Sequence, residues 1–103
     1  MIVYEVNLFV RREVEAAFRA WLPGHARELL ALPGLVSARI FEREDPAPPD
    51  GECVLCTQYT LRDAQALDDY LREHAARLRA DGLARFGGAF RAERRVLREL
   101  PAS

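Results

Sequence analysis

The chain has 103 residues, a size that suits one domain with one modest hydrophobic core. Half of the residues are hydrophobic and 30% are charged, the balance of a soluble globular protein. The net charge of −1 predicts no general attraction to nucleic acid or to an acidic membrane. No apolar run approaches the roughly 20 residues that span a bilayer, and no signal-peptide pattern opens the chain, so we expect a cytoplasmic protein.

Residues 1–10 predict a β-strand that is covered on both faces. One face is apolar apart from one phenol, with Ile2, Tyr4, Val6, Leu8 and Val10. The other face carries Val3, Glu5, Asn7 and Phe9. Alternation with period two is typical of a strand. Because the second face still holds two large apolar side chains, it is not a plain solvent face, and this indicates a partner subunit.

Helical periodicity follows over residues 13–32, interrupted by Pro23 and Gly24. Proline removes one helical hydrogen bond, so we expect a kink or two short helices that share one face. Residues 35–44 predict the second strand, the proline-rich segment 45–51 a loop, and residues 52–61 the third strand.

A second helix begins after the N-cap Asp63 and is expected to fail near Asp81 and Gly82. Its predicted buried stripe consists of Leu67, Tyr70, Leu71, His74 and Leu78. Residues 83–86 then predict a short turn or 3₁₀ segment, and residues 89–100 the fourth strand.

The order β-α-β-β-α-β predicts a single α+β domain over residues 1–103, a ferredoxin-like sandwich with one antiparallel sheet and both helices on one face. The open face would mix apolar with polar side chains: Val3, Phe9, Phe41 and Val54 with Glu5, Asn7, Ser37, Arg39, Gln58 and Thr60. Two such faces packed together would hide the apolar members. We therefore expect a homodimer through the sheet faces, which forms an α+β barrel.

Two pairs of chemically active residues each allow an ordinary structural interpretation. Cys53 and Cys56 form a C-x-x-C motif, but they lie within a predicted strand, where an offset of three puts the thiols on opposite faces. His25 and His74 both fall in the apolar phase of a helix. They could form a paired ligand or acid–base site, or be two boundary histidines with local partners. Without further ligands at suitable spacing, no metal site and no cofactor are expected.

Polar residues on otherwise apolar strands form the stronger candidate cluster. These are Glu5, Asn7, Arg39, Gln58 and one of Arg94 or Arg95. Leaving such groups buried without a partner costs about 1–3 kcal/mol each, so they should pair with one another, with a second subunit or with a ligand. An arginine on a cavity wall suits an anionic group. Two interpretations of this cluster stay open. It is either an Arg–Glu network that sets the register of the dimer, or a site that binds a ligand.

The arginine-rich end of the chain, residues 72–103, carries eight arginines against four acidic residues. It lacks interleaved aromatic residues for base stacking, and its arginines alternate with Glu93 and Glu99. We expect a solvated strand face with salt bridges rather than a nucleic-acid site.

Several motifs resemble a bacterial family known only as a domain of unknown function, within the dimeric α+β barrel superfamily. They are residues 1–8, Ala31-Leu32-Pro33-Gly34, Tyr70-Leu71-Arg72-Glu73-His74-Ala75, and Ala84-Arg85-Phe86-Gly87-Gly88 through Arg94-Arg95-Val96-Leu97. The resemblance spans nearly the whole chain and implies the fold and dimerisation, but no activity.

Two enzyme groups of the superfamily provide functional comparisons. The haem-degrading branch uses an asparagine in the first strand, a tryptophan early in the second helix and a histidine later in that helix. Asn7 and His74 are similar in placement, but the only tryptophan is Trp21, in the first helix.

Antibiotic-biosynthesis monooxygenases oxidise aromatic molecules without a cofactor, and resemblance to them implies roles for Glu5, Asn7, Arg39, Tyr59 and Tyr70. The candidate ligand-binding set is therefore Glu5, Asn7, Arg39, Gln58, Tyr59, Tyr70 and His74. Two hypotheses remain: a homodimeric small-molecule-binding or structural protein, and a cofactor-independent monooxygenase-like enzyme acting on a small aromatic or anionic metabolite.

Overall fold

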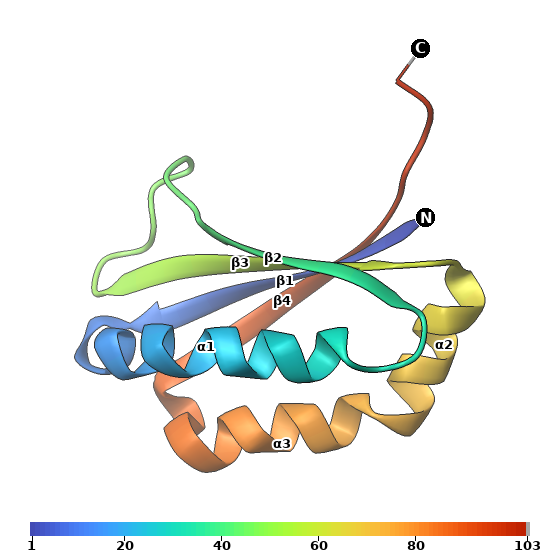
Figure 1. The fold of residues 1–103 in the computed structure, drawn as a ribbon. Coiled ribbons are helices and arrows are strands. Elements are labelled where there is room, and N and C mark those ends of the chain that lie inside the picture. The colour runs from blue at the N-terminus through green and yellow to red at the C-terminus, as the bar shows by residue number, and fades with distance from the viewer. Residues whose placement is uncertain (103) are drawn as a thin grey trace.

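The alternating residues at the start of the chain form β1, an inner strand of a four-stranded antiparallel sheet (Figure 1). The computed structural model describes residues 1–102. Its elements are β1 (Ile2–Arg11), η1 (Arg12–Val14), α1 (Glu15–Leu30), β2 (Leu35–Glu42), β3 (Glu52–Leu61), α2 (Ala64–Glu73), α3 (Ala75–Phe86), η2 (Gly87–Ala89) and β4 (Phe90–Arg98). The strand order β2-β3-β1-β4, with the helices on one face, confirms the ferredoxin-like α+β class.

The core lies between the sheet and the helices. Tyr4, Val6, Leu8 and Val10 of β1 are all buried there. They pack with the apolar face of α1: Phe18, Leu22, Ala26 and Leu29. Since each large side chain contributes roughly 1.5–3 kcal/mol on burial, this layer stabilises the fold and holds α1 against the sheet.

Helix α1 runs without a break through Pro23, so the alternative of two short helices is wrong. A proline in a helix interior costs roughly 3 kcal/mol. The buried face of α1 continues across the proline, from Phe18 and Leu22 to Ala26 and Leu29. Burial of that continuous face outweighs the lost hydrogen bond.

The second predicted helix is in fact two helices, α2 and α3, which meet at His74. His74 leaves helical geometry with φ −129°. Of the predicted buried stripe, Leu67, Tyr70 and Leu78 are buried, whereas His74 is half-buried and Leu71 is 40% exposed. Helix α3 then continues past Gly82, where termination was predicted, and ends at Phe86 before Gly87 with φ +54°. Gly82 stays helical because α3 packs closely here: a Cβ would lie 3.3 Å from the rings of Trp21 and Phe90.

The open face of the sheet is partly covered by its own chain. Phe9 is 5% exposed, because the guanidinium groups of Arg91 and Arg43 lie 3.8 and 5.2 Å from its ring centroid. Val54 is fully buried. The expectation that a second subunit is needed to cover these two side chains is therefore wrong. Phe41 remains exposed on this face, as does Leu97. None of the helices in residues 1–102 is long and apolar enough to cross a membrane.

Candidate functional site

The carboxylate of Glu5 is the centre of a hydrogen-bonded network on the open face of the sheet. Glu5 is 3% exposed, and it accepts hydrogen bonds from Asn7 Nδ2 at 2.9 Å and Gln58 Nε2 at 3.1 Å. Arg95 Nε donates to it at 2.5 Å. The Arg95 hydrogen bond, helped by those of Asn7 and Gln58, lowers the pKa of Glu5 to about 2 against the opposing effect of burial.

This network joins β1, β3 and β4 within one chain. Every buried side-chain polar atom among the described residues has a hydrogen-bond partner. Arg39 lies on the same face opposite Gln58, but its guanidinium stacks 5.4 Å from the ring centroid of Phe41 instead of joining Glu5. The geometry thus favours a structural network over a ligand site for Glu5, Asn7 and Gln58.

A pocket of about 290 Å³ lies on the other face, between the sheet and helices α1 and α3. Its volume is at the lower end of the roughly 300–1,000 Å³ of ligand pockets, which suits a molecule of one or two rings. The lining residues come from every strand except β2 and from all three α-helices, and they include Tyr4, Phe18, Trp21, His25, Thr57, Tyr59, Tyr70, Arg79, Gly82, Phe90, Ala92 and Arg94.

One end of the pocket is aromatic. Phe18 lies 5.3 Å from Trp21 and 5.2 Å from Phe90 between ring centroids, and Phe86 packs behind them, 4.8 Å from Phe18. Phe90 pairs with Val10 at the end of β1, so this wall stands where β4 begins. Such a wall provides apolar surface with the edge and face geometry that aromatic rings prefer.

The other end is polar and lies toward the start of β1. Tyr4 is paired with Tyr59 across the sheet, and its ring centroid is 5.7 Å from that of Tyr70 on α2. The hydroxyl of Tyr4 accepts a hydrogen bond of 2.9 Å from Arg79 on α3. Burial raises the pKa of both Tyr59 and Tyr70 to about 12, so these phenols stay protonated at neutral pH and can donate hydrogen bonds.

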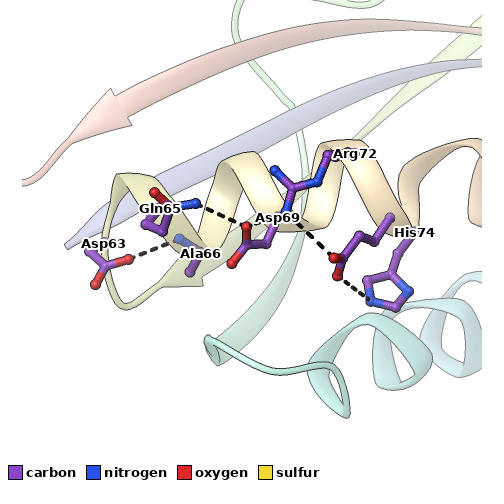
Figure 2. Close-up of polar contacts among 7 residues, drawn as sticks. Asp63, Gln65, Ala66, Asp69, Arg72 and His74 are labelled. Carbon is purple, nitrogen blue, oxygen red and sulfur yellow. Dashed lines mark hydrogen bonds and ion pairs between the residues drawn. The ribbon is translucent and has the colours of Figure 1, made fainter.

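The two histidines have different environments. His25 lines the pocket and stacks on Trp21 at 4.5 Å between ring centroids. Burial lowers its pKa below 6.5, against the opposing influence of Glu28 and Asp81, so the ring is neutral at pH 7. His74 lies at the junction of α2 and α3, outside the pocket, where its Nε2 is 3.9 Å from Glu73 (Figure 2).

Figure 2 also shows that the polar face of α2 is occupied by its own local contacts. Asp63 accepts a hydrogen bond from the amide of Ala66 and so caps the helix as predicted. Arg72 and Gln65 both donate to Asp69. His74 therefore belongs to a network of local contacts, with Glu73 and with Arg77, at the junction of α2 and α3.

The structure thus divides the candidates predicted from sequence. Of the candidate ligand-binding set, Tyr59 and Tyr70 line the pocket, and so does His25 of the predicted histidine pair. Sequence reasoning missed Arg79 and treated Tyr4 as a core residue, and it named Arg94 only as an alternative to Arg95 in the cluster around Glu5. A signal existed for Tyr4, because it lies on the helix-facing side of its strand, as Tyr59 does.

The remaining reactive groups do not form a second site. Cys53 faces the core beside Val10, and Cys56 is half-buried beside Asn7; both are free thiols on opposite faces, as predicted. Within residues 1–102, no three side chains of His, Cys, Asp or Glu gather closely enough to hold a metal ion.

Comparison with known proteins supports the resemblance seen in the sequence. Residues 1–100 match the family model described as Domain of unknown function (DUF4286). No curated protein matches the chain.

Solved structures share the fold. A Deinococcus radiodurans protein provisionally described as an antibiotic biosynthesis monooxygenase has a TM-score of 0.72 and 14% identity, over 100% of this chain and 96% of its own. The cofactor-independent oxygenase SnoaB of Streptomyces nogalater has a TM-score of 0.70 and 17% identity, over 98% and 95%. A Bacillus halodurans protein described as an ethyl tert-butyl ether d (EthD) family protein has a TM-score of 0.66 and 19% identity, over 97% and 100%.

Proposed function

The chain belongs to the DUF4286 family of domains of unknown function, and from this premise we propose that it is a cytoplasmic, homodimeric protein that binds a small aromatic molecule. The observation that carries the proposal is the pocket of about 290 Å³ with an aromatic wall at one end and a few converging polar groups at the other. This combination is the usual composition of a small-molecule site.

Binding can be tested by thermal-shift screening against small aromatic metabolites, followed by calorimetry. The indole N–H resonance of Trp21 reports where a ligand binds, because Trp21 is the only tryptophan and lines the pocket. Ala92→Leu adds volume inside the pocket and should abolish binding. Ala84→Leu, on the exposed surface of α3, is the matched control and should leave binding unchanged. Absence of any stabilising ligand, or equal loss in both variants, would contradict the proposal.

Dimerisation through the open face is supported by its remaining exposed apolar side chains. Phe41 is 40% exposed and Leu97 is 37% exposed on this face. Leu100, 71% exposed, follows β4 on the segment that leaves the sheet on the side opposite the helices (Figure 1).

Sedimentation equilibrium at micromolar concentration tests the dimer. We expect a dimer for the wild type and a monomer for Phe41→Glu. Leu71 on α2 is equally exposed, at 40%, so Leu71→Glu adds the same charge on the helix side and should stay dimeric. A monomeric wild type would refute this part of the proposal.

The second candidate function is a cofactor-independent monooxygenase-like activity. It is favoured by one feature of the pocket, the neutral His25 beside an aromatic wall, together with the fold shared with SnoaB. The test is oxygen uptake with a hydroxylated naphthalene in the presence of the protein. Uptake that depends on the protein and falls in His25→Gln would support catalysis, whereas uptake equal to the protein-free rate would leave a binding protein only.

A further inference from the structure

The pocket has an unbalanced charge. Three arginines line it, and no aspartate or glutamate does. Arg91 has partners elsewhere, because it forms ion pairs with Glu93 and Glu52 and stacks on Phe9. Arg79 and Arg94 form no ion pair with any described residue, although the protein as a whole carries more acidic than basic side chains.

The two unpaired arginines approach the pocket from opposite walls, at its polar end. Arg94 lies on β4 opposite Val6, and so projects to the helix-facing side of the sheet. Arg79 reaches in from α3 and donates to the hydroxyl of Tyr4. Both guanidinium groups are close enough to Tyr70 to act on its ionisation. Tyr4, Tyr70, Arg79 and Arg94 therefore surround one region.

Among the described residues, no acidic side chain lines the pocket to neutralise the two charges. Tyr59 and Tyr70 remain protonated at neutral pH, and His25 is neutral. All of these groups can donate hydrogen bonds, and guanidinium groups are donors only. An environment with two cations and several neutral donors is suited to an anionic acceptor, to which charge-assisted hydrogen bonds are roughly twice as strong as neutral ones.

The register of the sheet places this region away from the aromatic wall. Along β1, Tyr4 and Val6 are opposite Tyr59 and Arg94, whereas Leu8 and Val10 are opposite Ala92 and Phe90. We infer that the pocket takes an aromatic carboxylate of one or two rings, with its ring against Phe18, Trp21 and Phe90 and its carboxylate between Arg79 and Arg94. This inference rests on the proposed function and names the ligand class of the same pocket.

The experiment compares acids with their uncharged amides of the same shape. Benzoate, phenylacetate, 2-naphthoate and indole-3-acetate, each paired with its primary amide, are titrated into the protein by calorimetry at about pH 7 and low ionic strength. We expect at least one acid to bind at least tenfold more tightly than its amide and to shift the indole resonance of Trp21. Added salt should weaken the binding of the acid more than that of the amide.

Charge-removing variants locate the carboxylate. Arg79→Gln and Arg94→Gln should each lower the affinity for the acid about tenfold. The affinity for the amide should be unchanged in both variants. Arg85→Gln, on the same helix as Arg79 but outside the pocket, is the matched control and should retain the wild-type preference. All three side chains are exposed, so loss of the fold would not account for the effect.

The outcomes separate this inference from the proposed function. If acids and amides bind equally well and Trp21 responds, the pocket is a ligand site but the carboxylate preference is refuted. If no acid or amide binds, the proposed binding function fails together with this inference. A preference for acids that survives both variants would place the anion elsewhere and also refute the assignment.

Discussion

Removing the Arg95 side chain from the Glu5 network should make the stability of the protein less dependent on pH. Arg95→Gln takes away the shortest hydrogen bond to the Glu5 carboxylate and leaves those from Asn7 and Gln58. In the wild type, the pKa of Glu5 is lowered from 4.5 to about 2. A group with a lowered pKa in the folded state stabilises the protein above its ordinary pKa, and this contribution is lost as the pH falls toward 2.

The size of the effect follows from that change in pKa. A tenfold change in acid dissociation constant corresponds to about 1.4 kcal/mol, so the lowering of the Glu5 pKa from 4.5 to about 2 sets an upper limit of roughly 3–4 kcal/mol on the contribution of the whole network at neutral pH. Arg95 is 64% exposed as a side chain, so solvent screens its ion pair, and two hydrogen bonds remain in the variant. We therefore expect Arg95→Gln to lower the free energy of unfolding by about 1–2 kcal/mol at pH 7.

Urea denaturation at pH 7 and at about pH 2.5 measures the difference, at one fixed protein concentration because the stability of the proposed dimer would depend on that concentration. The difference between wild type and Arg95→Gln should shrink markedly at the lower pH, because most of the stabilisation from the lowered pKa of Glu5 is lost as the pH falls from 4.5 toward 2. Arg98→Gln, also on β4 but without an ion pair among the described residues, is the control and should cost little at either pH. A loss that is equal at both pH values would refute the electrostatic reasoning.

Three further predictions concern single positions. Gly34→Ala should lower the free energy of unfolding, measured by urea denaturation, by more than about 2 kcal/mol. The reason is that φ at this position is +84° and the new Cβ would lie 2.5 Å from the Cβ of the buried Ala66 on α2. Gly51→Ala, with φ +79° but open space, should cost only about 1–2 kcal/mol, and equal costs would show that the close approach is unimportant. Asp63→Ala should lower the melting temperature through a loss of about 1 kcal/mol, the usual value for an N-cap, and an unchanged melting temperature would contradict this. Trp21 fluorescence should change with a midpoint below pH 6.5, because the stacked His25 ring becomes protonated there. The free energy of unfolding should decline as the pH falls through the same range. If the fluorescence change persists in His25→Gln, another group causes it.

Local patterns were sufficient to predict the fold class. The alternation in β1, the N-cap at Asp63 and the proline-rich loop each depend on interactions within a few residues, so the sequence carries them directly. The same holds for the face on which each β1 side chain lies, because a strand has a strict period of two.

The helix breaks depended on contacts between distant residues. Gly82 was expected to end a helix, since glycine favours termination locally, but the rings of Trp21 and Phe90 pack against it and keep α3 continuous. Conversely, His74 sits in a good helical pattern and yet separates α2 from α3.

The sequence by itself determined the order of elements, the sheet and the polar character of Glu5 and Asn7. Only the tertiary structure decided that Glu5 is satisfied within one chain and that the candidate site lies on the opposite face. The physical reason is that Arg95 is 90 residues from Glu5, and Arg79 is 75 residues from Tyr4. No local pattern encodes which distant side chain meets a given carboxylate or phenol; packing of the sheet and helices brings these groups together.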